Sequence, residues 1–136
     1  MKFIMATHKT KEKLFAEVAS YLETDFVAEG KPSEHFFYNL DIMESMLAEP
    51  STALLVAKTD RGKLTAYLLL RFEPQMQAYV DISFLETCRA YRGQGVARAL
   101  IQFAREQYPD ATWVVSHAVE SAGDFYEKIG FVRGIE

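Results

Sequence analysis

Apolar residues recur with a helical period in three segments of the chain. Ser33 precedes the second segment and can cap the start of a helix, while Pro109 follows the third and ends it. Each spacing places the apolar side chains on one face of an amphipathic helix. The three faces carry Leu14, Val18 and Leu22; Phe36, Leu40, Met43 and Leu47; and Val96, Leu100, Phe103 and Ala104.

The segments around these helices have the patterns of strands. A turn at 59–63 contains Gly62, which can adopt a positive φ and join two strands as a hairpin. A further short helix at 122–129 is closed by Gly130. The order β-α-α-β-β-β-α-β-α-β predicts a mixed α/β fold with an antiparallel part and a later βαβ crossover. The predicted strands cover residues 1–7, 53–57, 64–72, 77–87, 112–119 and a last one from 131.

The long strand at 77–87 has two faces of different character. Strict alternation places Val80, Ile82 and Phe84 on one face, and Glu86 falls on that face too. The other face then carries Asp81, Ser83, Leu85 and Thr87.

Composition limits the class of protein. The 136 residues, 49% apolar and 25% charged, predict one globular domain over 1–136, and no apolar run is long enough to span a membrane. A net charge of −4 argues against a general nucleic-acid binder. The single cysteine, Cys88, excludes an internal disulfide, and the apolar stretch at the N-terminus is short for a signal peptide. We therefore expect a cytoplasmic protein without membrane or nucleic-acid partners.

A glycine-bearing loop, 91–98, lies between the long strand and the third amphipathic helix. Glycines let backbone N–H groups converge on a ligand, and the helix N-terminus and Arg92 add positive charge. The loop therefore predicts a phosphate cradle. It lacks both the Gly-Lys-Ser/Thr of a Walker loop and the spacing of a dinucleotide fingerprint. The alternative is a glycine-rich turn that only starts a helix.

Two motifs carry a resemblance to a known family. Arg92-x-x-Gly95-x-Ala97 resembles the acyl-CoA signature of the GNAT superfamily of N-acetyltransferases, and the A-x-x-F-Y-E-K-x-G-F run at 122–131 looks like its second signature. The resemblance implies a mixed, largely antiparallel sheet flanked by helices, here with a shortened C-terminal strand region. It also implies acetyl-CoA as co-substrate and no metal.

The resemblance assigns roles to particular residues. Leu85 and Thr87 would pair through their backbones with the pantetheine arm, and Tyr126 would protonate the leaving thiolate. The alternative role of Tyr126 is to pack against the sheet. The pyrophosphate would lie on the backbone N–H groups of Arg92, Gly93, Gln94, Gly95, Val96 and Ala97.

An amine acceptor is protonated near pH 7 and needs a base. Some family members place a glutamate that acts as this base where the chain has Asp81. Asp81 is therefore a candidate base, although a solvated acid on a strand explains it equally well. Glu86, predicted on the opposite face, is the poorer candidate. His117 could titrate near neutral pH, but a histidine packed in the fold is the more frequent case. Cys88 is interpreted as a loop thiol rather than a nucleophile.

The expected activity is acetyl transfer from acetyl-CoA to a primary amine: a small amine, a polyamine or a basic peptide. Acidic residues border the expected acceptor region and would attract a cation, although a solvated helix face explains them as well. The acids are Glu23, Asp25, Glu29, Glu34, Asp41, Glu44 and Glu49, against a single Lys31.

The rival function is a non-catalytic acyl-CoA-binding or interaction module, favoured modestly by Val119 in place of a frequent asparagine. Acylation of RNA is disfavoured by the charge. The short C-terminal region predicts an incomplete sheet edge. A homodimer that completes it is the favoured solution, and a monomer whose edge is blunted by Arg133, Gly134 and Glu136 is the alternative.

Overall fold

The computed structural model describes residues 1–28, 33–72 and 79–115. Within them lies a five-stranded sheet in the order β1-β2-β3-β4-β5. Strands β1 to β4 are antiparallel, whereas β4 and β5 are parallel and joined through helix α3. The strands are β1 Lys2–Met5, β2 Thr52–Lys58, β3 Leu64–Phe72, β4 Tyr79–Thr87 and β5 Thr112–Val115; the helices are α1 Lys11–Ala28, α2 Ser33–Leu47, a short 3-10 turn η1 Arg89–Tyr91 and α3 Val96–Gln107.

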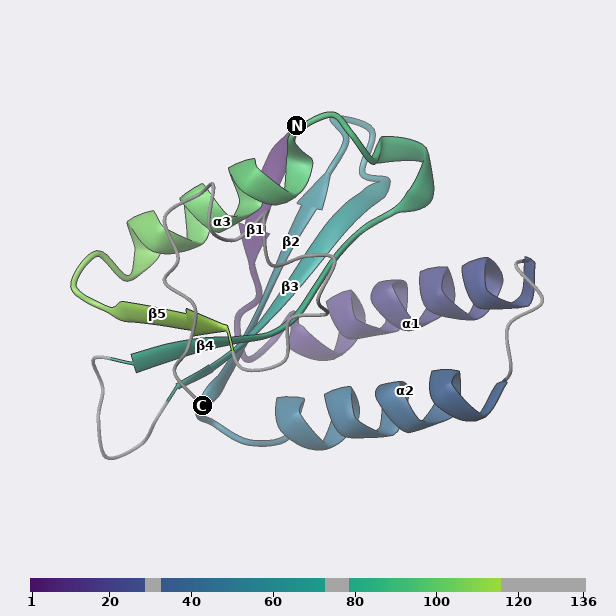
Figure 1. Cartoon of the computed structure of the whole chain (residues 1–136), viewed down its shortest axis with the longest axis horizontal. Helices are drawn as coiled ribbons and strands as arrows, with labels where there is room; N and C mark the ends of the chain where they lie inside the picture. Colours follow the sequence, from purple (N-terminus) through teal and green to yellow (C-terminus); the bar gives the residue numbers. More distant parts are fainter. Residues whose placement is uncertain (29–32, 73–78, 116–136) are drawn as a thin grey trace.

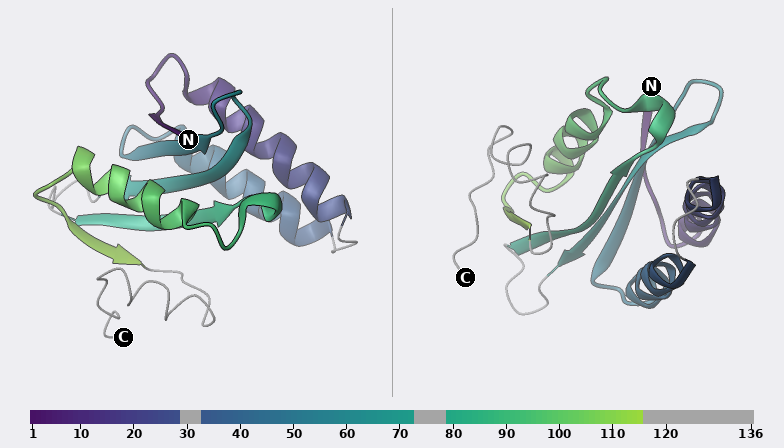
Figure 2. Two further views of the ribbon diagram at one scale, coloured as in Figure 1. Left: turned by 90° about the horizontal axis from the view of Figure 1, so that it is seen from above. Right: turned by 45° about the vertical axis from the view of Figure 1, so that its right-hand side comes forward.

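This arrangement confirms the predicted fold class, a mixed and mainly antiparallel sheet with flanking helices. Helices α1 and α2 cover one face of the sheet, and α3 covers the other (Figures 1 and 2). The predicted hairpin turn is present: Gly62 has φ +87°, and its N–H donates to the Thr59 carbonyl at 2.9 Å. The predicted helix at 122–129 and the strand from 131 lie outside the described residues.

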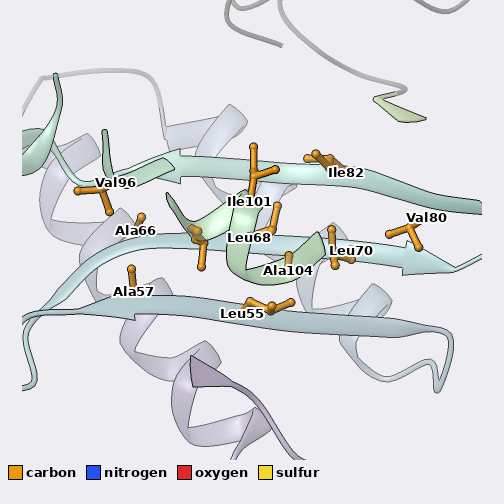
Figure 3. Close-up of a cluster of buried hydrophobic side chains, with 11 residues drawn as sticks. Leu55, Ala57, Ala66, Leu68, Leu70, Val80, Ile82, Val96, Ile101 and Ala104 are labelled. Carbon is orange, nitrogen blue, oxygen red and sulfur yellow. The ribbon is translucent and has the colours of Figure 1, made fainter. Parts of the chain in front are cut away.

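The face under α3 is packed by aliphatic side chains. Figure 3 shows residues of β2, β3 and β4 meeting Val96, Ile101 and Ala104 of α3. The predicted Val96, Leu100 and Ala104 are buried, Phe103 is partly buried, and Ile101, which the pattern did not include, is buried as well. The buried cluster comprises Leu55, Ala57, Ala66, Leu68, Leu70, Val80, Ile82, Val96, Leu100, Ile101 and Ala104.

The face under α1 and α2 has its own core. The predicted helix positions Leu14, Val18, Leu22 and Met43 are buried there, which confirms both amphipathic patterns where side chains are described. From the sheet, this core takes Leu54, Val56, Tyr67 and Leu69, with Phe84 packed against them. The two cores therefore use alternate residues of the same strands.

A β-bulge in β4 changes which residues share a face. Leu69 pairs with Phe84 while Leu70 pairs with Ile82, so Ser83 is an extra residue in the ladder. Before the bulge, Ile82 points to the α3 core; after it, Leu85 packs on that core. The prediction of strict alternation was therefore wrong from Ser83 onward.

The bulge moves Asp81 relative to the residues that follow. Asp81 lies on the α1/α2 face, opposite Ile82, and does not share a face with Leu85 and Thr87. Glu86, whose cross-strand neighbour Tyr67 belongs to the α1/α2 core, lies on the same face as Asp81. The placement of Glu86 on the face opposite Asp81 was thus also wrong, because one inserted residue inverts a period of two.

Candidate active site

The loop after β4 leaves the start of α3 open. Gly93 and Gly95 both have φ +78°, a left-handed conformation that glycine adopts without strain. A Cβ built at either glycine would have no described neighbour within 4 Å. Gly95 is the N-cap of α3, and no described side chain caps the helix. Among the described residues, nothing caps the first N–H groups of α3, and such groups can bind an anion.

Arg92 folds back onto the end of β4. Its Nε donates to the Thr87 carbonyl at 3.0 Å, and its Nη2 lies 3.4 Å from Glu86 Oε1. The side chain is about half exposed, at 50%. Its charge is thus shared with Glu86, whereas the sequence predicted a cation directed at the cradle.

Glu86 is held from the core side as well. The hydroxyl of Tyr67 donates to Glu86 Oε2 at 2.7 Å, and Tyr67 is only 3% exposed. Burial first, and then the nearby Glu86 carboxylate, raise the pKa of Tyr67 well above its usual value near 10. The phenol therefore stays protonated and remains a donor at neutral pH.

A second tyrosine braces the same segment. The Arg89 backbone N–H donates to the Tyr21 hydroxyl of α1 at 3.0 Å, immediately before the loop. Cys88, beside it, is 4% exposed. Sequence reasoning assigned no role to Tyr21 or Tyr67, since their partners lie far along the chain.

The backbone groups of Leu85 and Thr87 in β4 point toward the side on which β5 lies. The N–H of Cys88, just after β4, donates to the carbonyl of Thr65 in β3 at 2.8 Å. Because the direction of backbone groups alternates, those of Leu85 and Thr87 point to the opposite edge, the β5 side. Described pairing with β5 runs from Tyr79–Thr112 to Ile82–Val115. This geometry fits an extended ligand along Leu85, while the Thr87 carbonyl already accepts from Arg92.

Asp81 lies at the opposite end of β4 from the loop. Its carboxylate accepts a hydrogen bond from the Ser83 hydroxyl at 3.3 Å, and its cross-strand neighbour is Arg71. The side chain is half-buried. The bulge at Ser83 thus separates Asp81, on the α1/α2 face, from Leu85 and Thr87 on the other.

Several predicted positions have no described surroundings. Tyr126, His117 and Val119 lie outside the described residues, so their roles stay predictions. Of the acidic set, Glu23, Asp41, Glu44 and Glu49 are exposed.

Within 1–28, 33–72 and 79–115, no group of three His, Cys, Asp or Glu side chains is placed to hold a metal ion. Among the helices of the same ranges, none has the length and apolar character that a membrane crossing needs.

The fold is that of solved acetyltransferase structures. The structure of Tetrahymena GCN5 is similar with a TM-score of 0.70 at 14% identity, covering 96% of this chain and 78% of that one. At that identity the likeness shows the fold alone. The sequence profile of the Acetyltransferase (GNAT) family matches residues 15–131. The chain therefore belongs to the GNAT acetyltransferase family.

Curated relatives agree with this assignment. An uncharacterised N-acetyltransferase of Shouchella clausii is 35% identical over 77 residues, which cover 57% of this chain and 44% of the relative. The peptidyl-lysine N-acetyltransferase YjaB of Escherichia coli is 31% identical over 91 residues, 67% of this chain and 56% of the relative. The matches thus span about half the length of these two relatives.

Proposed function

We propose that this chain transfers an acetyl group from acetyl-CoA to a primary amine by direct attack in a ternary complex. One observation carries the proposal: within the described residues, two left-handed glycines leave open space before the N-terminus of α3, which no described side chain caps. Backbone N–H groups from Gly93 to Ala97 bind the pyrophosphate there, where the helix dipole favours an anion. The backbone of Leu85 aligns the pantetheine arm along the β5-side edge of β4.

The remaining residues move protons during the transfer. The amine nitrogen forms the new bond to the acetyl carbon, and the carbon–sulfur bond breaks. Asp81 takes the amine proton through a water molecule, because it lies on the α1/α2 face rather than beside Leu85. Tyr126 gives a proton to the departing thiolate, an assignment that rests on the second signature alone. Positioning of the two substrates supplies the rest of the rate.

The acceptor is a cationic amine in this proposal. Glu23, Asp41, Glu44 and Glu49, in and after α1 and α2, are exposed carboxylates that would attract a cation. YjaB, named for peptidyl-lysine acetylation, supports a basic peptide among the candidate acceptors. Small amines and polyamines share the same charge and belong in the same screen.

Two measurements test the proposal. Calorimetric titration with CoA is expected to show binding, and incubation with acetyl-CoA and a panel of amines and basic peptides is expected to release free thiol. Absence of CoA binding would overturn the proposal. Binding without turnover on any acceptor would support the alternative, a non-catalytic acyl-CoA-binding module on the same fold.

A further inference from the structure

The guanidinium of Arg92 is engaged at two separate points of the protein. Its Nε reaches the Thr87 carbonyl at 3.0 Å and its Nη2 approaches Glu86 Oε1 at 3.4 Å. A planar fork with several donors can satisfy both acceptors at once, whereas a lysine ammonium offers a single point of charge. Arg92, which directly follows η1, is thereby fixed against the end of β4.

Arg92, with its two acceptors Thr87 and Glu86, forms what we call the clamp. Glu86 connects this clamp to the protein core. Its other carboxylate oxygen accepts from Tyr67, which is buried among the residues under α1 and α2. Tyr67 and Glu86 are direct cross-strand neighbours, so the ladder of β3 and β4 sets the position of the carboxylate. A chain of contacts therefore runs from the core through Glu86 to Arg92.

We propose that Glu86 is a positioning residue for the donor site, which holds Arg92 against β4 and so sets the path of Gly93 to Gly95 into α3. The inference rests on the proposed function, since it assumes that CoA binds at this loop. It assigns Arg92 to the protein's own clamp and leaves phosphate binding to the backbone N–H groups.

Two substitutions separate the clamp from a direct phosphate contact. Glu86→Gln keeps an oxygen for Tyr67 but removes the charge that faces Arg92. Arg92→Lys keeps the positive charge but removes the fork. Each is expected to weaken CoA affinity about fivefold, the upper range for a partly exposed ion pair. The double variant is expected to lose about the same factor rather than its square, because both changes break one unit.

Kinetics supply a readout that simple destabilisation would not move. Both variants are expected to raise KM for acetyl-CoA about fivefold and to leave kcat unchanged. With S-acetyl-N-acetylcysteamine, a thioester donor without phosphates, both are expected to match the unchanged protein, because the loop then has no pyrophosphate to bind.

A matched control comes from another ion pair of the fold. Lys58 Nζ lies 2.7 Å from Glu17 Oε2, and Glu17 takes no part in the loop. Glu17→Gln makes the same chemical change there and is expected to leave CoA affinity as it is.

The outcomes discriminate. Glu86→Gln with unchanged CoA binding, or Arg92→Lys with full affinity, would overturn the positioning role. Tighter CoA binding by Glu86→Gln would overturn it too and would point to Arg92 as a direct phosphate ligand. A natural chain that binds no CoA would instead remove the proposed function and this inference with it.

Discussion

The two faces of the sheet differ in what they bury. Under α3 the buried residues are all aliphatic, from Leu55 to Ala104, and they support a helix whose open N-terminus follows two glycines. Under α1 and α2 the core includes Tyr67, whose hydroxyl binds a carboxylate at the end of β4. Asp81 lies on that second face too.

This difference indicates a division of labour within one sheet. Aliphatic packing has no directional demands, so the α3 face serves to hold backbone N–H groups in a fixed place. A buried polar group, in contrast, needs its partner, so the α1/α2 face places side chains by specific hydrogen bonds. The bulge at Ser83 lets the single strand β4 serve both faces.

The largest expected effect follows from the loop at the start of α3. Gly95→Glu is expected to abolish detectable CoA binding, because it places an anion in the open space and strains a backbone at φ +78°. Gly62→Glu is the matched control, since Gly62 has φ +87°, equally open surroundings and no part in the site. Calorimetric titration of both variants with CoA gives the comparison, and normal affinity in a folded Gly95→Glu protein would remove the site assignment.

The next effect tests the proton donor predicted from the second signature. Tyr126→Phe keeps the ring and removes the proton, so turnover is expected to fall on the order of 10²-fold. CoA affinity is expected to stay close to that of the unchanged protein. Steady-state rates with a responsive amine measure the change, and equal turnover would make Tyr126 a packing residue.

A smaller effect probes the acid on the α1/α2 face. Asp81→Asn is expected to slow turnover about tenfold at pH 7, because bulk water partly replaces the base. The deficit is expected to shrink toward pH 9.5, where more of the amine is already neutral. Rates of both proteins from pH 6 to 9.5 show the trend. A constant ratio across that range would count against Asp81 and turn attention to His117.

The smallest effect concerns the buried tyrosine. Tyr67→Phe is expected to lower the free energy of unfolding by roughly 1 to 2 kcal/mol at pH 8, since it removes a hydrogen bond to a charged acceptor. Because the folded pKa of Tyr67 is raised, its contribution is present below the unfolded pKa near 10 and is lost as pH rises through the folded value. Urea unfolding at pH 8 and 10.5 is therefore expected to show a narrower gap between the two proteins at the higher pH. A gap that widens would contradict the raised pKa.

The sequence by itself determined the local elements and the loop. The bounds of β3 and the start of α3 agree with the hydrophobic pattern, because the spacing of apolar residues within one element defines the face that it buries. The glycines at 93 and 95 were predictable as an open loop for a similar reason, since only the backbone of those residues is involved.

Tertiary structure alone decided how the side chains of β4 divide between the faces. The bulge at Ser83 adds one residue that strict alternation does not accommodate, and it inverted the predicted relation of Asp81 to Leu85 and Glu86. The bond from Tyr67 to Glu86 joins residues 19 positions apart, and the register of two strands sets it. Arg92 lies against the end of β4, where the Thr87 carbonyl and the Glu86 carboxylate both contact its guanidinium. The spacing of these residues in the sequence does not predict that contact.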